Sequence, residues 1–135
     1  MGYAQKPLKP NLTIGIALYN GEYFITKAIE SVLKQSYSNY EIFISDDNST
    51  DKSSEICINY SNADDRIRYI RQKTQLGEHG NKFYLINNAK GKYFKLLDQD
   101  DYLIGETYLE SMISKIKEGY DFVLPNVDLF IKHQY

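Results

Sequence analysis

The chain has 135 residues, of which 42% are hydrophobic and 25% are charged, a composition typical of one soluble globular domain and not of a disordered chain. Its 16 basic and 18 acidic residues give a net charge of -2, which argues against a nucleic-acid-binding surface. The single cysteine, Cys57, excludes an intrachain disulfide, and no apolar run approaches the ~20 residues of a membrane span. We therefore expect a cytoplasmic protein without a membrane span.

The N-terminal part of the chain predicts a strand followed by a helix. After an extension formed by residues 1–10, the nearly continuous apolar run Leu12–Leu18 predicts a strand that is buried on both faces. This strand ends at the turn signal Tyr19-Asn20-Gly21. The next apolar residues recur at helical spacing and predict an amphipathic helix that lies on a sheet; they are Ile25, Ala28, Ile29, Val32 and Leu33.

The middle of the chain repeats this order. A second strand is predicted over Glu41–Ser45, and it leads into the polar segment Asp46–Asp51. Within that segment, Ser49 or Thr50 can cap the helix that follows. Polar and apolar residues then alternate in Arg66–Arg71, which predicts a third strand that is half exposed.

The last part of the chain predicts a loop, two helices and two strands. Two glycines make Thr74–Asn81 a loop, and Phe83–Ala89 is expected to be helical. A fourth strand, Lys92–Leu97, runs into an aspartate-rich segment, and a further helix ends at Gly119 before a last strand at Phe122–Leu124. Because strands and helices alternate, the expected fold class is α/β, with a mainly parallel, doubly wound sheet.

Polar residues follow the predicted strands at the edge where such sheets bind ligands. The first strand ends at Tyr19, the second at Asp46 and Asp47, and the fourth at the segment Asp98–Asp101. Two like charges about 4 Å apart repel by about 4 kcal/mol at an effective dielectric constant of about 20, so clustered carboxylates need a compensating cation or donor. The Asp-x-Asp spacing can present oxygens to one Mg²⁺ or Mn²⁺ ion, whose shell a diphosphate would complete. Aspartate-rich strand ends also occur as solvated turns and helix caps, and that alternative stays open.

Three segments together contain the predicted strands and their polar ends. Their sequences are TIGIALYNGEYFITKAIESVLKQSYSNYEIFISDDNSTDKS, RIRYIRQ and GKYFKLLDQDDYL. Together they resemble the nucleotide-binding half of family-two glycosyltransferases, which have the Rossmann-like GT-A fold. The resemblance covers about Leu12–Leu103. It implies that residues 1–135 form a single, truncated domain that binds a nucleotide diphosphate sugar, with a UDP-sugar as the expected donor, and that lacks the acceptor-binding half.

The resemblance also implies an activity. The expected reaction is metal-dependent transfer of the sugar, with inversion, to a glycan or lipid-linked hydroxyl acceptor, as in polysaccharide biosynthesis. Mn²⁺ or Mg²⁺ is the implied cofactor. Such a protein can associate with a membrane peripherally, without spanning it.

Particular residues take roles from the resemblance. It places Asp47 on the nucleotide base, Asp98 toward the ribose and Asp100 on the metal ion and the diphosphate, with Asp98 as a second metal ligand. Lys82 stands where the family often has an arginine, and it would supply the positive charge. The other donor-binding residues that the resemblance implies are Ala17, Leu18, Tyr19 and Gln99.

Structural alternatives accompany these roles. The Tyr19 ring can cap the edge of the core instead of flanking a base, and Lys82 can be a solvated surface lysine. Asp47 can be a helix cap, like its neighbours Ser49 and Thr50. We expect Asp46 and Asp101 to cap backbone amides and not to bind a ligand.

Inverting transfer requires a general base that takes the proton of the acceptor hydroxyl. In the resembled family this base comes from a segment beyond the position of Tyr135, so the chain is expected to be inactive or weakly active alone. Two other classes stay open, a nucleotide-binding scaffold without catalysis and a phosphoacceptor receiver domain. A receiver domain places its acidic pair after the first strand, whereas here that strand ends in Tyr19-Asn20 and the pair follows the second.

Overall fold

The computed structural model describes residues 9–124 and 129–132, with their side chains up to residue 119, and so most of the predicted N-terminal extension lies outside the described residues. Four parallel strands form the main sheet: β1 (Leu12–Leu18), β2 (Tyr40–Asp46), β3 (Ile67–Arg71) and β4 (Tyr93–Asp98). Their order across the sheet is β3-β2-β1-β4. Since β2 and β4 lie on opposite sides of β1, the strand order reverses between β1 and β4, where a ligand-binding crevice is expected.

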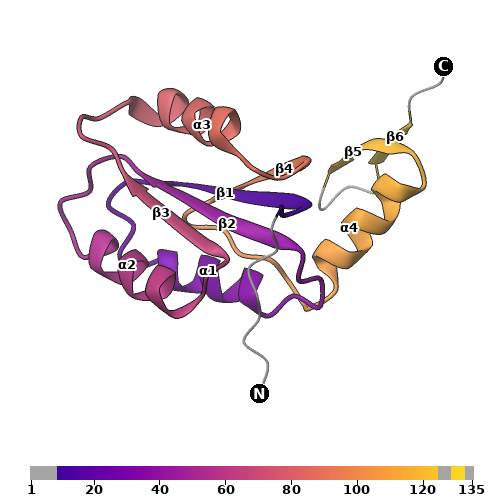
Figure 1. Cartoon of the computed structure of the whole chain (residues 1–135), viewed down its shortest axis with the longest axis horizontal. Coiled ribbons are helices and arrows are strands. Elements are labelled where there is room, and N and C mark those ends of the chain that lie inside the picture. Colours follow the sequence, from indigo (N-terminus) through magenta and orange to yellow (C-terminus); the bar gives the residue numbers. More distant parts are fainter. Residues whose placement is uncertain (1–8, 125–128, 133–135) are drawn as a thin grey trace.

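Helices cover both faces of this sheet. α1 (Ile25–Leu33) and α2 (Ser53–Ala63) lie on one face, and α3 (Gly77–Asn88) lies on the other (Figure 1). The expected α/β class with a mainly parallel, doubly wound sheet is therefore confirmed. The first four strands begin and end within one residue of the predicted positions. The loop predicted over Thr74–Asn81 is wrong from Gly77 onward, because α3 begins there and not at Phe83.

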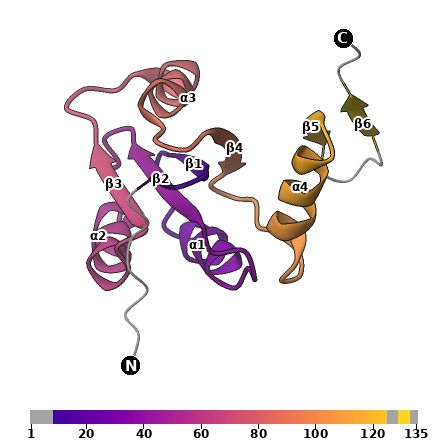
Figure 2. The same ribbon diagram turned by 45° about the vertical axis from the view of Figure 1, so that its right-hand side comes forward.

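The C-terminal part of the chain adds a helix, which shares the main hydrophobic cluster, and a second, two-stranded sheet. α4 (Tyr108–Lys117) lies beyond β4, beside a two-stranded antiparallel sheet of β5 (Tyr120–Leu124) and β6 (Leu129–Lys132) (Figure 2). The short β6 was not predicted, because four residues give too little periodicity for a strand to be recognised. Within the described ranges, no helix is both long and apolar enough to cross a membrane.

The centre of the core lies at β1 and β2. Every residue of β2 is buried, and so is every residue of β1 except Ala17. This explains why β1 reads as a continuous apolar run, because a strand that is covered on both faces has no solvent-facing side. The apolar face of α1 packs against β1 and β2 and contributes Ile25, Ala28, Ile29 and Val32 to the main hydrophobic cluster.

One buried carboxylate links three strands near their amino-terminal ends, on the side of the sheet opposite the pocket-forming carboxyl ends. Glu41 in β2 is only 2% exposed and accepts hydrogen bonds from Thr13 Oγ1 in β1 (2.9 Å) and from the Lys90 amide (2.9 Å). Both Nε and Nη2 of Arg68 in β3 also donate to this carboxylate, at 3.2 and 3.1 Å. The guanidinium of Arg68 stacks on the ring of Phe43, 3.5 Å from its centroid. Glu41 therefore joins three strands of the sheet.

Replacement of this carboxylate, Glu41→Gln, is expected to lower the free energy of unfolding by about 2–4 kcal/mol, because Arg68 loses its counter-ion in a largely buried place. Burial alone would raise the pKa of Glu41, but the hydrogen bonds from Arg68 and its neighbours outweigh burial and hold the pKa below its ordinary value. The stabilisation is thus complete above the unfolded-state pKa of about 4.3 and is lost as pH falls through the folded-state pKa.

Urea unfolding at neutral and acidic pH measures this effect. The difference between wild type and Glu41→Gln should shrink as the pH falls, while Glu55→Gln, at an exposed position on α2, should change little at either pH. A Glu41→Gln penalty of the same size at both pH values would contradict the assignment.

Candidate functional site

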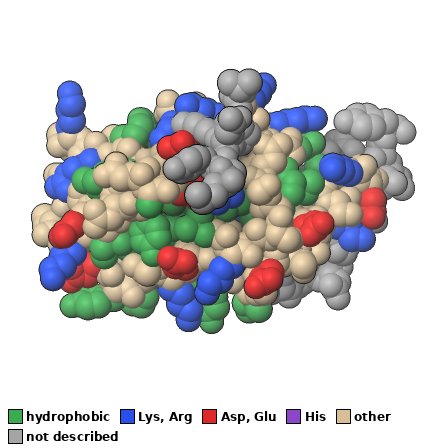
Figure 3. Space-filling view, turned by 60° about the horizontal axis from the view of Figure 1, so that its bottom comes forward, with side chains coloured by type: hydrophobic (Ala, Val, Ile, Leu, Met, Phe, Trp, Pro, Cys, Tyr) green, Lys and Arg blue, Asp and Glu red, His purple; other side chains and the backbone are tan. Residues whose placement is uncertain are grey.

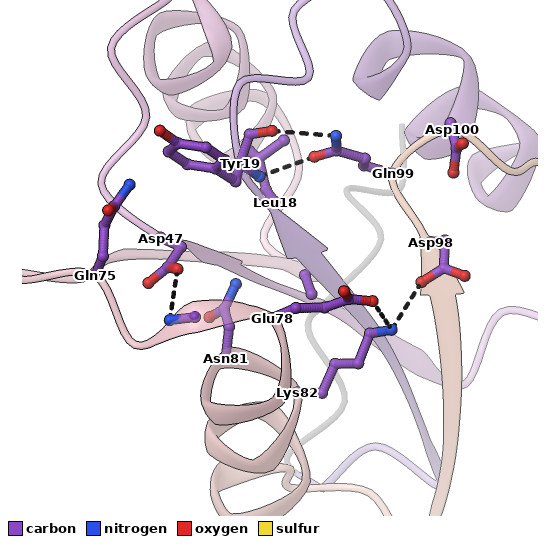
Figure 4. Close-up of a pocket in the computed structure, with 12 residues that line it drawn as sticks. Leu18, Tyr19, Asp47, Gln75, Glu78, Asn81, Lys82, Asp98, Gln99 and Asp100 are labelled. Carbon is purple, nitrogen blue, oxygen red and sulfur yellow. Dashed lines mark hydrogen bonds and ion pairs between the residues drawn. The ribbon is translucent and has the colours of Figure 1, made fainter.

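A pocket of about 610 Å³ lies at the carboxyl edge of the sheet, between the ends of β1, β2 and β4 and the start of α3 (Figure 4). It coincides with the place where the strand order reverses, and its volume is within the usual range for small-molecule sites. Every ligand-binding candidate predicted from the sequence lines it: Ala17, Leu18, Tyr19, Asp47, Lys82, Asp98, Gln99 and Asp100.

The loop after β1 is held by the segment that follows β2. The Asn20 amide donates to Ser49 Oγ (2.9 Å), and the Gly21 amide donates to Ser53 Oγ (2.9 Å). In return, the Thr50 amide donates to Asn20 Oδ1 (2.8 Å). The prediction that Ser49 or Thr50 caps α2 is therefore wrong, because both residues bind the loop after β1 instead.

Gln99 fixes the backbone of Tyr19 from the opposite side of this loop. Its Oε1 accepts a hydrogen bond from the Tyr19 amide (2.8 Å), and its Nε2 donates to the Tyr19 carbonyl (3.1 Å). A Cβ at Gly21 would lie 2.8 Å from Gln99 Oε1, so a larger residue there would push the Gln99 amide out of this position. The Tyr19 ring lies at the rim of the pocket and is 46% exposed. Gln99 thus lines the pocket but uses its amide to position Tyr19.

Asp47 caps a helix and also faces the pocket. The side chain is only 5% exposed; Oδ1 accepts a hydrogen bond from the Leu76 amide (2.6 Å), and Oδ2 accepts one from the Gly77 amide (3.0 Å). These amides lie at the N-terminus of α3, where no carbonyl of the helix can reach them. Asp47 is therefore the helix cap that the sequence allowed, but it caps α3 and not α2.

The other aspartates of the strand ends behave differently. Asp46 is fully buried, where it accepts hydrogen bonds from the Ser49 amide (2.9 Å) and from Tyr69 Oη (2.6 Å), so its predicted capping role is confirmed. Burial, together with this bond to Asp46, raises the pKa of the Tyr69 hydroxyl to about 12. The side chain of Asp101 is exposed, and its backbone amide closes the turn by donating to the Asp98 carbonyl (3.0 Å). Among the described residues, the carboxylate of Asp101 caps no amide, contrary to the prediction.

The pocket concentrates negative charge. Asp47, Glu78, Asp98 and Asp100 are among its lining residues, whereas Lys82 is the only cation in that described set. Lys82 Nζ lies 2.8 Å from Glu78 Oε1 and 3.5 Å from Asp98 Oδ1. The hydrogen bond to Glu78 raises the pKa of Lys82 and lowers the pKa of the Glu78 carboxyl. On the face that carries α1 and α2, by contrast, acidic and basic side chains are interspersed (Figure 3).

Sequence reasoning missed four lining residues, Gln75, Gly77, Glu78 and Asn81. All of them fall in the segment that was predicted to be a loop. Asn81 is 2% exposed and its Nδ2 donates to the Ser45 carbonyl (2.9 Å), which fixes α3 to the end of β2. A helical interpretation would have placed Glu78 and Lys82 one turn apart on one face.

Asp98 and Asp100 offer the oxygen ligands that Mg²⁺ and Mn²⁺ prefer. Both residues are exposed to solvent. Within the described part of the chain, no group of three or more acidic, histidine or cysteine side chains is placed to hold a metal ion. The two carboxylates fit a magnesium-type site in which water and substrate phosphates complete the coordination.

Comparison with known proteins identifies the family. Residues 13–135 match the sequence model of the family described as Glycosyl transferase family 2. The chain is 35% identical over 118 residues to the GalNAc(5)-diNAcBac-PP-undecaprenol beta-1,3-glucosyltransferase of Campylobacter jejuni, covering 87% of this chain and 38% of that protein. It is 33% identical over 112 residues to the UDP-Glc:alpha-D-GlcNAc-diphosphoundecaprenol beta-1,3-glucosyltransferase WfgD of Escherichia coli, covering 82% of this chain and 43% of that protein.

The fold has a counterpart among solved structures. S. aureus TarS 1-349 in complex with UDP-GlcNAc is 26% identical with a TM-score of 0.74, over 81% of this chain and 32% of that one. This similarity confirms the expected GT-A fold. The chain spans less than half the length of the relatives that it matches. It belongs to glycosyl transferase family 2, as the match over residues 13–135 shows.

Proposed function

We propose that this chain is the donor-binding domain of a glycosyltransferase that takes its sugar from a nucleotide diphosphate sugar, with a UDP-sugar as the donor. The observation that carries the proposal is the pocket at the strand-order reversal, which is lined by all eight candidate residues. The similar protein TarS has been crystallised with UDP-GlcNAc. In this proposal Asp47 accepts the N–H of the base, Tyr19 flanks the base, and Asp98 lies on the ribose side.

The acceptor in this proposal is a glycan or a lipid-linked sugar. Two relatives support a lipid-linked acceptor, because their names place the accepting sugar on undecaprenol diphosphate. The proposal places the domain in the cytoplasm, peripheral to the membrane that holds such an acceptor. Transfer proceeds with inversion, and a general base takes the proton of the acceptor hydroxyl.

A divalent cation is part of the proposal because the pocket carries more negative than positive charge. A diphosphate entering beside Asp98 and Asp100 would be repelled, since like charges a few ångströms apart interact by roughly 1–4 kcal/mol depending on the local dielectric. Mn²⁺ or Mg²⁺ held by these two carboxylates would neutralise the leaving diphosphate. Lys82 adds a positive charge on the α3 side of the pocket.

Titration calorimetry with UDP tests the proposal. UDP is expected to bind in the presence of Mn²⁺ and to lose about tenfold or more in affinity when EDTA removes the ion, because the carboxylates then face the diphosphate uncompensated. Equal affinity in both conditions would remove the metal from the proposal. Absence of UDP binding in both conditions would contradict the proposal that this pocket binds the donor.

A further inference from the structure

The lysine of the pocket already has a carboxylate partner supplied by its own helix. Glu78 and Lys82 lie one turn apart on α3, and Oε1 of Glu78 accepts a hydrogen bond from Lys82 Nζ at 2.8 Å. On the β4 side, Asp98 Oδ1 lies 3.5 Å from the same nitrogen. Glu78 and Asp98 thus approach the Lys82 amine from two different elements (Figure 4).

The two partners of Lys82 differ in what they can do. Asp98 belongs to the strand-end motif that the proposed function uses for metal and ribose, so a bound cation would engage it. Glu78 belongs to the lining of the pocket but has no place in that motif, and its side chain is 73% exposed. When a cation engages Asp98, Glu78 remains as the partner of the lysine.

From this arrangement, and resting on the proposed function, we propose that Glu78 is a specificity-determining residue that suppresses binding of metal-free nucleotide. Without nucleotide, its carboxylate pairs with the Lys82 amine, and an entering diphosphate must displace the carboxylate to reach that amine. It also adds a negative charge beside the place where the diphosphate enters. This repulsion opposes a bare diphosphate more strongly than a diphosphate whose charge is already reduced by Mn²⁺. Glu78 therefore increases the dependence of donor binding on the metal.

A purely structural role for Glu78 makes a different prediction. An acidic residue in the first turn of a helix stabilises that helix through the helix dipole, and an exposed pair four residues apart contributes only a little to stability. Glu55 occupies the first turn of α2 and is exposed, but it does not line the pocket. Glu55→Gln is therefore a matched control that removes a helix-terminal carboxylate away from the site.

The test measures UDP affinity by titration calorimetry, with EDTA and with Mn²⁺, for wild type, Glu78→Gln and Glu55→Gln. Without metal, Glu78→Gln is expected to bind UDP about threefold to tenfold more tightly than wild type. With Mn²⁺ the gain should be smaller, so the ratio of the two affinities falls. Glu55→Gln should reproduce the wild-type values. If Glu78→Gln bound UDP without metal no more tightly than wild type does, the inference about Glu78 would be overturned. The proposed function would still stand, because wild type binds UDP.

A double variant shows whether Glu78 acts through Lys82. In the Lys82→Met background, Glu78→Gln should increase the metal-free affinity for UDP less than it does in wild type. The reason is that this background has no Lys82 amine for the substitution to free for the diphosphate. An equal gain in both backgrounds would overturn this route. Absence of UDP binding by wild type under every condition would overturn the proposed function and the inference with it, which distinguishes that failure from the failure of Glu78 alone.

Discussion

Asp47→Ala is expected to destabilise the protein and to remove its preference for uridine diphosphate over cytidine diphosphate. The substitution leaves the amides of Leu76 and Gly77 without their acceptor, and the loss of a helix-capping side chain costs about 0.5–2 kcal/mol. A carboxylate only accepts hydrogen bonds, so Asp47 can pair with the N–H of uracil but not with the ring acceptor of cytosine. Wild type should therefore prefer UDP by about tenfold or more, and the variant should bind the two nucleotides alike.

Asp51→Ala is the matched control for this prediction. Asp51 also accepts two backbone hydrogen bonds, from the Glu22 amide (3.1 Å) and the Ser53 amide (2.9 Å), but it does not line the pocket. The Asp51→Ala substitution should lower the melting temperature and leave the ratio of the affinities for uridine diphosphate and cytidine diphosphate unchanged. If Asp47→Ala lowered the melting temperature and also kept that ratio, Asp47 would be a helix cap only and the assignment to the base would be wrong.

Asp100→Asn is expected to weaken Mn²⁺-assisted binding of UDP by about tenfold or more, because a neutral amide is a much poorer ligand for a hard cation than a carboxylate. Asp101→Asn should have little effect. Both side chains are exposed, and both substitutions keep the volume while removing one charge, but only Asp100 lines the pocket. Calorimetric titration of each variant with UDP in Mn²⁺ and in EDTA separates the metal-dependent part of the affinity.

The opposite result would place the motif differently. Loss of the metal effect in Asp101→Asn with a normal response in Asp100→Asn would mean that the metal-binding register is shifted by one residue. An unchanged metal effect in both variants would remove the strand-end aspartates from the metal site.

The strands were predictable because their burial leaves a plain pattern. β1 and β2 are covered on both faces, so their sequences are nearly continuous apolar runs with polar residues at the ends. Because parallel strands present their carboxyl ends at one edge of the sheet, the sequence alone predicts that Tyr19, Asp47 and Asp98 lie near one another. Topology and burial were sufficient for this part of the site.

The start of α3 was not predictable from local sequence. Gly77 has a φ of 79° and, with Gly80, favours a loop on local criteria. The helix begins there because Asp47, thirty residues earlier, accepts the first two amides. Since Glu78 and Asn81 lie on this first part of α3, the contribution of α3 to the pocket could be seen only once the distant cap was known.

Proton–nitrogen correlation NMR of the chain during titration with UDP and Mg²⁺ tests most directly that this pocket holds a nucleoside diphosphate. The largest shift changes are predicted at amides beside the pocket, namely those of Leu18, Tyr19, Leu76, Gly77 and Gln99. The amides of α2 and α4, which contribute no lining residue, should change little. Shift changes that cluster on α2 or α4, or no change at a large excess of UDP, would contradict the assignment of this pocket as the donor site.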